Sequence, residues 1–200
     1  MHLADIPVPS TAAAEAAAEV VAQYSAPALV NHCIRAYLFA AARAQLDGLP
    51  VDFELLYVSA MLHDIGLEPA FDSHTIAFEQ AGGHVAWVFA AGAGWPAERR
   101  RRAAGVVVAH MVGADPATDP EGHLLDIATG LDISGRGPDG WPPELLREIV
   151  AAYPRLDLVD RFLACFRDQA ERKPGSSAAE AMRGGLPDRI TVNPLDRLAP

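Results

Sequence analysis

Histidine and aspartate side chains on successive expected helices are the residues of this chain that could carry out chemistry. His63 and Asp64 are adjacent and end an apolar helical run. Ionisable side chains at the end of a buried helix need a hydrogen bond, a charge partner or a metal ion. Four further helices carry other candidates, which are His32, His84, His110 and Asp132. A helix bundle can bring such ligands to one interior point, so these residue types indicate a metal site.

Imidazole nitrogens and carboxylate oxygens suit a divalent transition metal, zinc or iron in particular, and do not suit a thiolate site or a magnesium site built only from oxygens. His2, His74 and His123 lie in a tail or near helix starts. For those three we expect capping or surface roles.

Apolar residues recur at helical spacing along most of the chain, and no stretch shows the alternation typical of a strand. The expected helices cover residues 10–24, 28–46, 53–63, 74–91, 97–112, 122–133, 143–153, 157–173 and 177–184. Asp52 and Ser73 are expected to cap the third and fourth of these helices. The chain after Gly185 is expected to be irregular. The predicted fold class is all-α, a helical bundle with a metal site in its interior.

Length, composition and charge restrict the class of protein. A chain of 200 residues can bury one substantial core. The net charge of −10 opposes a nucleic-acid partner, which needs a basic surface. No long uninterrupted apolar stretch and no basic segment leading into an apolar one is present, so we expect no membrane partner, no secretory signal and a cytoplasmic protein. Cys33 and Cys165 are expected to be core residues.

The run of four arginines at 99–102 is the local exception to the acidic composition. Four consecutive residues fan around a helix and cannot share one face. We expect their stems to lie on apolar surface with the charged groups in water, and the alternative is that one of them reaches a carboxylate or an anionic substrate.

The order of His32, His63, Asp64 and Asp132 resembles the H…HD…D signature of the HD-domain superfamily. The segments NHCIRAYLFA (31–40), LHDIGL (62–67), FEQAGG (78–83), HLLDIATGLDISG (123–135), YPRLD (153–157) and RKP (172–174) resemble its cyanamide hydratase-like branch. The resemblance covers most of residues 28–175. It implies an HD domain there, between an N-terminal tail and helix (1–27) and a C-terminal helix and irregular tail (176–200). It also implies one metal ion, usually zinc, held by those four residues.

His84 and His110 leave the number of metal ions open. They complete the order H…HD…H…H…D, which resembles the dinuclear HD proteins, among them mixed-valent di-iron oxygenases. His110 also has a counterpart in the cyanamide hydratase-like pattern, where His84 would be an apolar residue. One ion with four ligands is therefore the first expectation. Two ions, with His84 and His110 on the second, are the alternative.

The resemblance implies an enzyme in which a metal-bound hydroxide attacks a small electrophilic substrate, as in the hydration of cyanamide to urea. Asp64 or His110 would move the proton. Glu79 would orient a ligand imidazole. Arg35, one turn after His32, would pair with Glu79 or another carboxylate. The expected catalytic residues are therefore Asp64, His110 and Glu79.

Other readings of the same residues are a di-iron oxygenase acting on a small molecule, an HD phosphohydrolase and a non-catalytic HD module. The single lysine, Lys173, counts against a phosphonate substrate and mildly against a phosphate ester. We expect the rim of a substrate pocket at residues 66–74, at residues 113–122 and around Trp141. An exposed apolar face on the helix at 10–24 would permit a homodimer.

Overall fold

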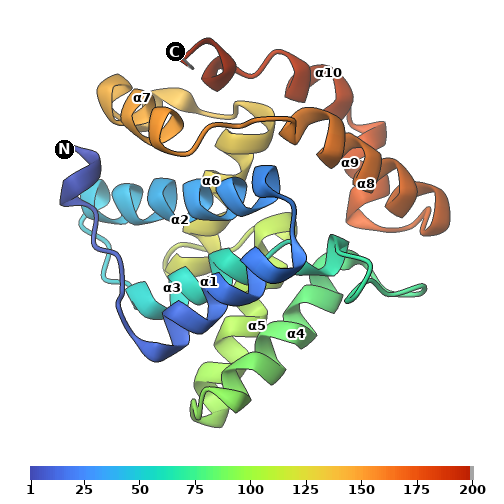
Figure 1. The fold of residues 1–200 in the computed structure, drawn as a ribbon, viewed down its shortest axis with the longest axis horizontal. Helices are drawn as coiled ribbons and strands as arrows, with labels where there is room; N and C mark the ends of the chain where they lie inside the picture. The colour runs from blue at the N-terminus through green and yellow to red at the C-terminus, as the bar shows by residue number, and fades with distance from the viewer. Residues whose placement is uncertain (199–200) are drawn as a thin grey trace.

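The computed structural model describes residues 1–198, and in that range the chain is helical with no β-strand (Figure 1). The α-helices are α1 (Ala12–Tyr24), α2 (Pro27–Asp47), α3 (Phe53–Leu62), α4 (Phe78–Gly92), α5 (Ala97–Val112), α6 (Pro120–Ser134), α7 (Pro143–Ala152), α8 (Leu158–Arg172), α9 (Ser177–Arg183) and α10 (Leu186–Thr191). Short 3₁₀ helices are η1 (Leu3–Asp5), η2 (Ile65–Leu67), η3 (Pro138–Gly140) and η4 (Pro194–Arg197). The all-α fold class is confirmed.

Side-chain caps set several of the helix starts. Asp52 Oδ1 accepts the backbone N–H of Leu55 at 3.0 Å, which begins α3 as predicted. Thr11, Asp119 and Ser176 cap α1, α6 and α9 in the same way. These local hydrogen bonds explain why the sequence indicates most helix boundaries to within a few residues.

Two parts of the chain differ from the prediction by more than two residues. Helix α4 begins at Phe78 instead of residue 74, and its N-cap is Ala77. Ser73 Oγ instead accepts the N–H groups of Thr75 and Ile76 and closes a turn before the helix. The ammonium group of Lys173 donates to the carbonyl oxygens of Ser73 and Ile76, so these carbonyls are not available to a helix. The C-terminal region is also more ordered than predicted, because it forms α10 and η4.

Helix α2 runs through the middle of the molecule, with α1 and α3 on one side of it and α7 on the other (Figure 1). Helices α3 and α6 pack directly on α2. Helices α4 and α5 pack on each other as a hairpin that extends away from α2, while α8, α9 and α10 lie at the opposite side (Figure 1). The middle of α2, residues 35–42, is therefore buried, whereas its last turn, residues 45–47, is exposed.

Two clusters of buried apolar side chains fill the interior. The larger one takes residues from α1 to α7 and also Leu195 of η4. The smaller one is centred on α8 and includes Phe78, Phe162 and Phe166. Ala13, Ala17 and Val21 of α1 belong to the larger cluster, whereas Tyr24 at the end of the helix is exposed, and the homodimer stays a prediction. The divisions predicted near residues 27 and 175 stay predictions.

Arg99, the first residue of the arginine run, contacts two carboxylates and an aromatic ring. Arg99 pairs with Asp52 at 2.8 Å and with Glu54 at 2.6 Å, and its guanidinium lies 3.7 Å from the centre of a Trp95 ring. The carboxylate alternative for this run is therefore confirmed for Arg99, whose charged group also lies over an aromatic ring. In the described part of the chain, none of the helices has the length and apolar character needed to cross a lipid bilayer.

Candidate metal centre

His32 of α2, His63 at the end of α3 and Asp64 form a buried group whose potential ligand atoms face one another. The Nε2 atoms of the two histidines are 3.0 Å apart. Oδ2 of Asp64 lies 3.3 Å from Nε2 of His32 and 3.2 Å from Nε2 of His63. Ligand atoms about 2.0–2.1 Å from a tetrahedral zinc ion lie roughly 3.3–3.4 Å from each other. The spacing of the group fits a single metal ion.

A break in the helix lets neighbouring side chains face the same point. Successive residues of a continuous helix are about 100° apart around its axis. Helix α3 ends at Leu62, and Asp64 takes φ −100° and ψ 5°, a conformation outside the regular helix. The chain then continues as η2, which packs against α4. His63 and Asp64 therefore converge because the regular helix ends at Leu62, just before them.

The hydrogen bonds of the two imidazoles direct their Nε2 atoms to the centre. The Nδ1 atom of His63 donates to the carbonyl oxygen of Ala60 at 2.7 Å, and a carbonyl can only accept. The Nδ1 atom of His32 donates to a carboxylate oxygen of Asp132 at 2.6 Å. With Nδ1 protonated in both rings, Nε2 is the atom left for a metal ion, which is the arrangement found at histidine metal sites.

The charges of the centre favour a cation between its members. Burial acts to lower the pKa of His63, but the neighbouring Asp64 carboxylate overcomes it and raises that pKa to about 10. Burial acts to raise the pKa of Asp64, but His63 and the other two imidazoles hold it well below its usual range. Oδ2 of Asp64 is buried and accepts no hydrogen bond. The donor set and this unpaired oxygen fit a bound divalent ion, which would replace the proton on His63.

The Asp132 carboxylate lies behind His32 and not beside the ligand atoms of His63 and Asp64, so its predicted role as a metal ligand stays a prediction. Its carboxylate contacts Nδ1 of His32, the ring nitrogen that faces away from His63. Arg35 holds the same carboxylate with two bonds, from Nε to Oδ1 at 2.9 Å and from Nη2 to Oδ2 at 2.7 Å. Arg155 adds a third at 3.0 Å. Asp132 therefore orients a candidate ligand.

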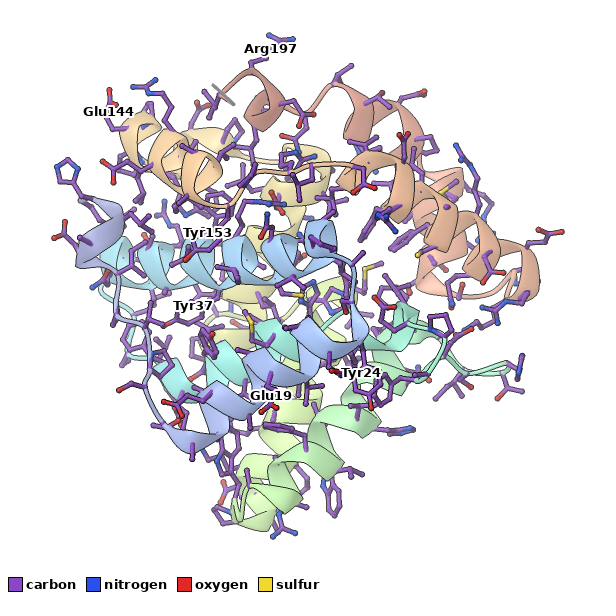
Figure 2. The ribbon with its side chains drawn as sticks, viewed as in Figure 1. Glu19, Tyr24, Tyr37, Glu144, Tyr153 and Arg197 are labelled. Atoms are coloured by element: carbon purple, nitrogen blue, oxygen red, sulfur yellow. The ribbon has the colours of Figure 1, made fainter. Side chains whose placement is uncertain are left out.

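The buried arginine on α2 also links the centre to α7. Arg35 Nη1 donates to the backbone carbonyl of Tyr153, just after α7, at 2.9 Å; that residue is labelled in Figure 2. Burial acts to raise the pKa of Asp132, but Arg35 beside it depresses that pKa strongly. The Asp132 carboxylate thus stays ionised and keeps the His32 proton on Nδ1. Of the two partners predicted for Arg35, the structure shows another carboxylate and not Glu79.

His110 of α5 stands next to the group on the other side of Asp64. Its Nε2 atom is 3.6 Å from Asp64 Oδ1, and its ring centre is 4.8 Å from that of His63. Nδ1 donates to the backbone carbonyl of Val107. Nε2 is buried and has no hydrogen-bond partner. The structure therefore brings His110 to the centre with a free nitrogen atom directed at it.

His84 and Glu79 lie elsewhere. His84 is exposed on the outer side of α4, where it lines a shallow surface hollow with Gln80 and Val108. Glu79 is buried, but its carboxylate accepts a hydrogen bond from the Ser177 hydroxyl of α9 at 2.7 Å and orients no imidazole. The predicted roles of His84 as a ligand and of Glu79 beside a ligand do not match these positions.

A cavity of about 160 Å³ opens onto the centre. One wall is apolar, and the stacked rings of Phe162 and Phe166, 4.3 Å apart, form part of it. Polar residues from α6 and the loop after it also line the cavity, among them Thr129, Ser134 and Arg136. Typical sites for drug-sized ligands enclose roughly 300–1,000 Å³. The cavity therefore has room only for a small molecule.

The entrance of this cavity is not where the sequence predicts it. Apart from the residues of the centre, Met111 and Arg136, its lining comes from α6, α8, α9 and α10, and includes Asp126, Ala181 and Arg189. Trp141 is buried, and its indole N–H donates to the carbonyl of Phe39 at 2.9 Å. The short α10, which the sequence pattern does not predict, supplies Leu186 and Arg189.

Two curated proteins of Saccharomyces cerevisiae are similar to this chain. They are cyanamide hydratase DDI2 and cyanamide hydratase DDI3, each 28% identical over 176 residues that cover 84% of this chain and 77% of the relative. No family model matches the chain. The chain is therefore a distant relative of proteins named cyanamide hydratase, which agrees with that part of the resemblance seen in the sequence.

The charges of the centre predict how the stability of metal-depleted protein depends on pH. The pKa values of Asp64 and Asp132 are lower in the folded protein than their ordinary value of about 3.8. Their ionised carboxylates therefore stabilise the fold above about pH 3.8, and this stabilisation is lost as the pH falls toward their pKa values in the folded protein. The pKa of His63 is raised from 6.5 to about 10 in the folded protein. Its protonated imidazole therefore stabilises the fold fully below pH 6.5, and this stabilisation is lost as the pH rises to about 10. These groups therefore give most stability between pH 3.8 and 6.5.

Urea unfolding at a series of pH values tests this window. Without metal, the free energy of unfolding should fall from pH 6.5 to pH 10. Because metal binding requires a deprotonated imidazole, the stabilisation gained on adding zinc should grow over the same range. A metal-depleted protein that becomes more stable toward pH 10 would contradict the charge assignment.

Proposed function

We propose that the protein is a metal-dependent hydratase of the HD-domain superfamily that adds water to a small nitrile-like substrate such as cyanamide. The buried His32–His63–Asp64 group is the observation that carries this proposal. Its ligand atoms have the mutual spacing of a single metal site. Three protein ligands with one position open to substrate or water are typical of catalytic zinc sites. The similarity to proteins named cyanamide hydratase supports the choice of reaction.

In this proposal His32, His63 and Asp64 hold the ion. A divalent ion bound there would lower the pKa of a coordinated water toward neutrality and so would supply hydroxide at physiological pH. The cavity of about 160 Å³ matches a substrate of a few heavy atoms. The apolar wall around Phe162 keeps bulk water from the reacting carbon.

His110 is the residue we assign to proton movement. Adding water to a nitrile forms a carbon–oxygen bond, moves one π-electron pair onto nitrogen, and requires a proton to pass from oxygen to that nitrogen. The free Nε2 of His110 lies beside Asp64 and lines the cavity, so it can accept the proton and deliver it. The resulting isourea then converts to urea by a second proton shift.

Urea formation tests the proposed function. Protein that has been stripped by chelator and reloaded with Zn²⁺ or Fe²⁺ should convert cyanamide to urea, and the stripped protein should not. Urea can be measured with a urease-coupled assay, using the heat-denatured protein as background. A fully loaded protein that forms no urea above this background would overturn the proposed reaction.

Phosphomonoester hydrolysis is the second candidate, because the guanidinium groups of Arg136 and Arg189 line the cavity. Arg136 is paired with Asp126 at 2.6 Å, which reduces its attraction for a phosphate. Release of phosphate from a small phosphomonoester by the same loaded protein would favour this reaction. The di-iron alternative is not supported, because His84 is exposed and away from the centre.

A further inference from the structure

A chain of buried and half-buried charges connects the centre to the C-terminal part of the protein. Arg155, on the loop between α7 and α8, is 5% exposed. Its Nη1 donates to Oδ1 of Asp132 at 3.0 Å and also to the backbone carbonyl of Asp132. Its Nε donates to Oδ1 of Asp196 in η4 at 2.6 Å. Arg155 thus joins the carboxylate behind His32 to a residue 64 positions further along the chain than Asp132.

The segment 193–196 is fixed at the end of α6 by a second contact. The side-chain amide of Asn193, which is 2% exposed, donates to the backbone carbonyls of Leu131 and Asp132 at 3.1 and 2.8 Å. The last carbonyl groups of a helix lack partners within the helix, and buried ones need donors from elsewhere. Asn193 and Arg155 supply such donors at Asp132 itself, the residue that orients His32, and Asn193 also at the neighbouring Leu131.

Packing keeps this segment in place. Leu195 is fully buried in the larger apolar cluster. A Cβ atom on Gly135, which ends α6 with φ +67°, would lie 2.4 Å from Cδ of Pro194, so the two segments are in close contact. Arg197, the next residue after Asp196, lies at the surface (Figure 2). The buried side of segment 193–196 therefore faces the end of α6 while its outer side faces solvent.

We propose that Arg155 and the C-terminal segment 193–196 are positioning groups of the metal centre. Arg155 holds the Asp132 carboxylate together with Arg35, and Asn193 and Asp196 hold Asp132 and Arg155 in turn. With both oxygens of Asp132 fixed, the hydrogen bond to His32 Nδ1 keeps the ring directed at Asp64 and His63. This inference rests on the proposed metal site, and its test includes a readout that needs no metal.

Two substitutions change the contacts between Arg155, Asp132 and Asp196 with little change in side-chain volume. Arg155→Lys keeps the positive charge but cannot contact Asp132 and Asp196 together. Asp196→Asn removes the charge of the outer partner. The matched controls are Arg161→Lys and Asp157→Asn, because Arg161 and Asp157 form an exposed ion pair at 2.6 Å. Urea unfolding of each variant shows how much of any change is a general loss of stability.

Two measurements follow. Zinc affinity, from competition with a chromophoric chelator, should fall about 10- to 100-fold in Arg155→Lys, as for other groups that orient a ligand, and less in Asp196→Asn. In metal-depleted, ¹⁵N-labelled protein, the His32 Nδ1–H resonance should shift or broaden in Arg155→Lys. Both controls should leave the affinity and the resonance unchanged.

The possible results distinguish a failure of the positioning role of Arg155 from a failure of the proposed metal site. An Arg155→Lys protein with lower stability but an unchanged His32 resonance and an unchanged zinc affinity would overturn the positioning role. A wild-type protein that binds no zinc would overturn the metal site, and the His32 resonance would still decide whether Arg155 orients that ring. A changed resonance with a weakened affinity supports the inference.

Discussion

Replacing His63 by alanine is expected to remove the metal ion and with it the urea-forming activity. His63 contributes Nε2 to the group and is the charge partner of Asp64, at 3.2 Å. The loss of metal affinity should exceed the roughly 10- to 100-fold effect of a group that only orients a ligand. Metal content per chain after equilibrium dialysis against zinc measures the effect directly.

The matched control is His84→Ala. Since the side chain of His84 is exposed on α4, its removal should leave metal content and activity at the wild-type level. The far-ultraviolet circular dichroism of both variants verifies that the helices are retained. A His63→Ala protein that is folded and still binds one equivalent, or a His84→Ala protein that loses metal, would contradict the assignment of ligands.

Replacing Gly66 by alanine is expected to have the largest effect on stability among the glycine substitutions. A Cβ atom at this position would lie 2.1 Å from the carbonyl oxygen of Phe78 and 2.9 Å from the N atom of Gly82. Both contacts are to backbone, so α4 and η2 must move apart. The cost of such overpacking is about 1–3 kcal/mol or more. Because η2 follows directly after Asp64, zinc affinity should fall as well.

Gly105→Ala is the control for this prediction. Gly105 lies in the middle of α5 with no heavy atom within 4 Å of an added Cβ. Alanine there should raise the free energy of unfolding by roughly 0.5–1 kcal/mol, because glycine is the less favourable residue inside a helix. Urea unfolding measures both variants. A Gly66→Ala protein as stable as wild type would show that η2 and α4 do not pack as closely as described.

Local patterns account for what could be predicted from the sequence. Helical periodicity and capping residues such as Asp52 act within a few positions, and they gave the all-α fold and most helix boundaries. The pair His63–Asp64 and the more distant His32 could be identified by residue type and by resemblance. The start of α4 could not, because Lys173, about a hundred residues away, binds the carbonyls that precede it.

His84 shows which signal in the sequence separates a ligand from a surface residue. The buried face of α4 carries small residues at helical spacing, among them Gly83, Ala86 and Ala90. His84 shares its outward face with Trp87 and Val88, which are 40% and 66% exposed. The place of His84 in the order of histidines along the chain resembles the dinuclear pattern. On α4, however, His84 lies on the exposed face and not on the buried face that a ligand in the interior would need.

The position of the Asp132 carboxylate depends on contacts that the spacing of residues along the sequence does not determine. The signature order places an aspartate near the end of α6, but it does not determine which nitrogen of His32 the carboxylate meets. That choice depends on Arg35 and Arg155, which hold Asp132 from two other parts of the chain. The role of Arg155 follows only from the folded structure.

The stoichiometry and ligand set of the bound metal test the central claim most directly. Wild-type protein saturated with zinc and freed of excess metal by gel filtration should hold one ion per chain by elemental analysis. X-ray absorption of the same sample should show nitrogen and oxygen neighbours at about 2.0–2.1 Å, with the outer-shell scattering of imidazole and no sulfur. Two ions per chain, no retained ion, or an ion without imidazole neighbours would contradict a single metal held by His32, His63 and Asp64.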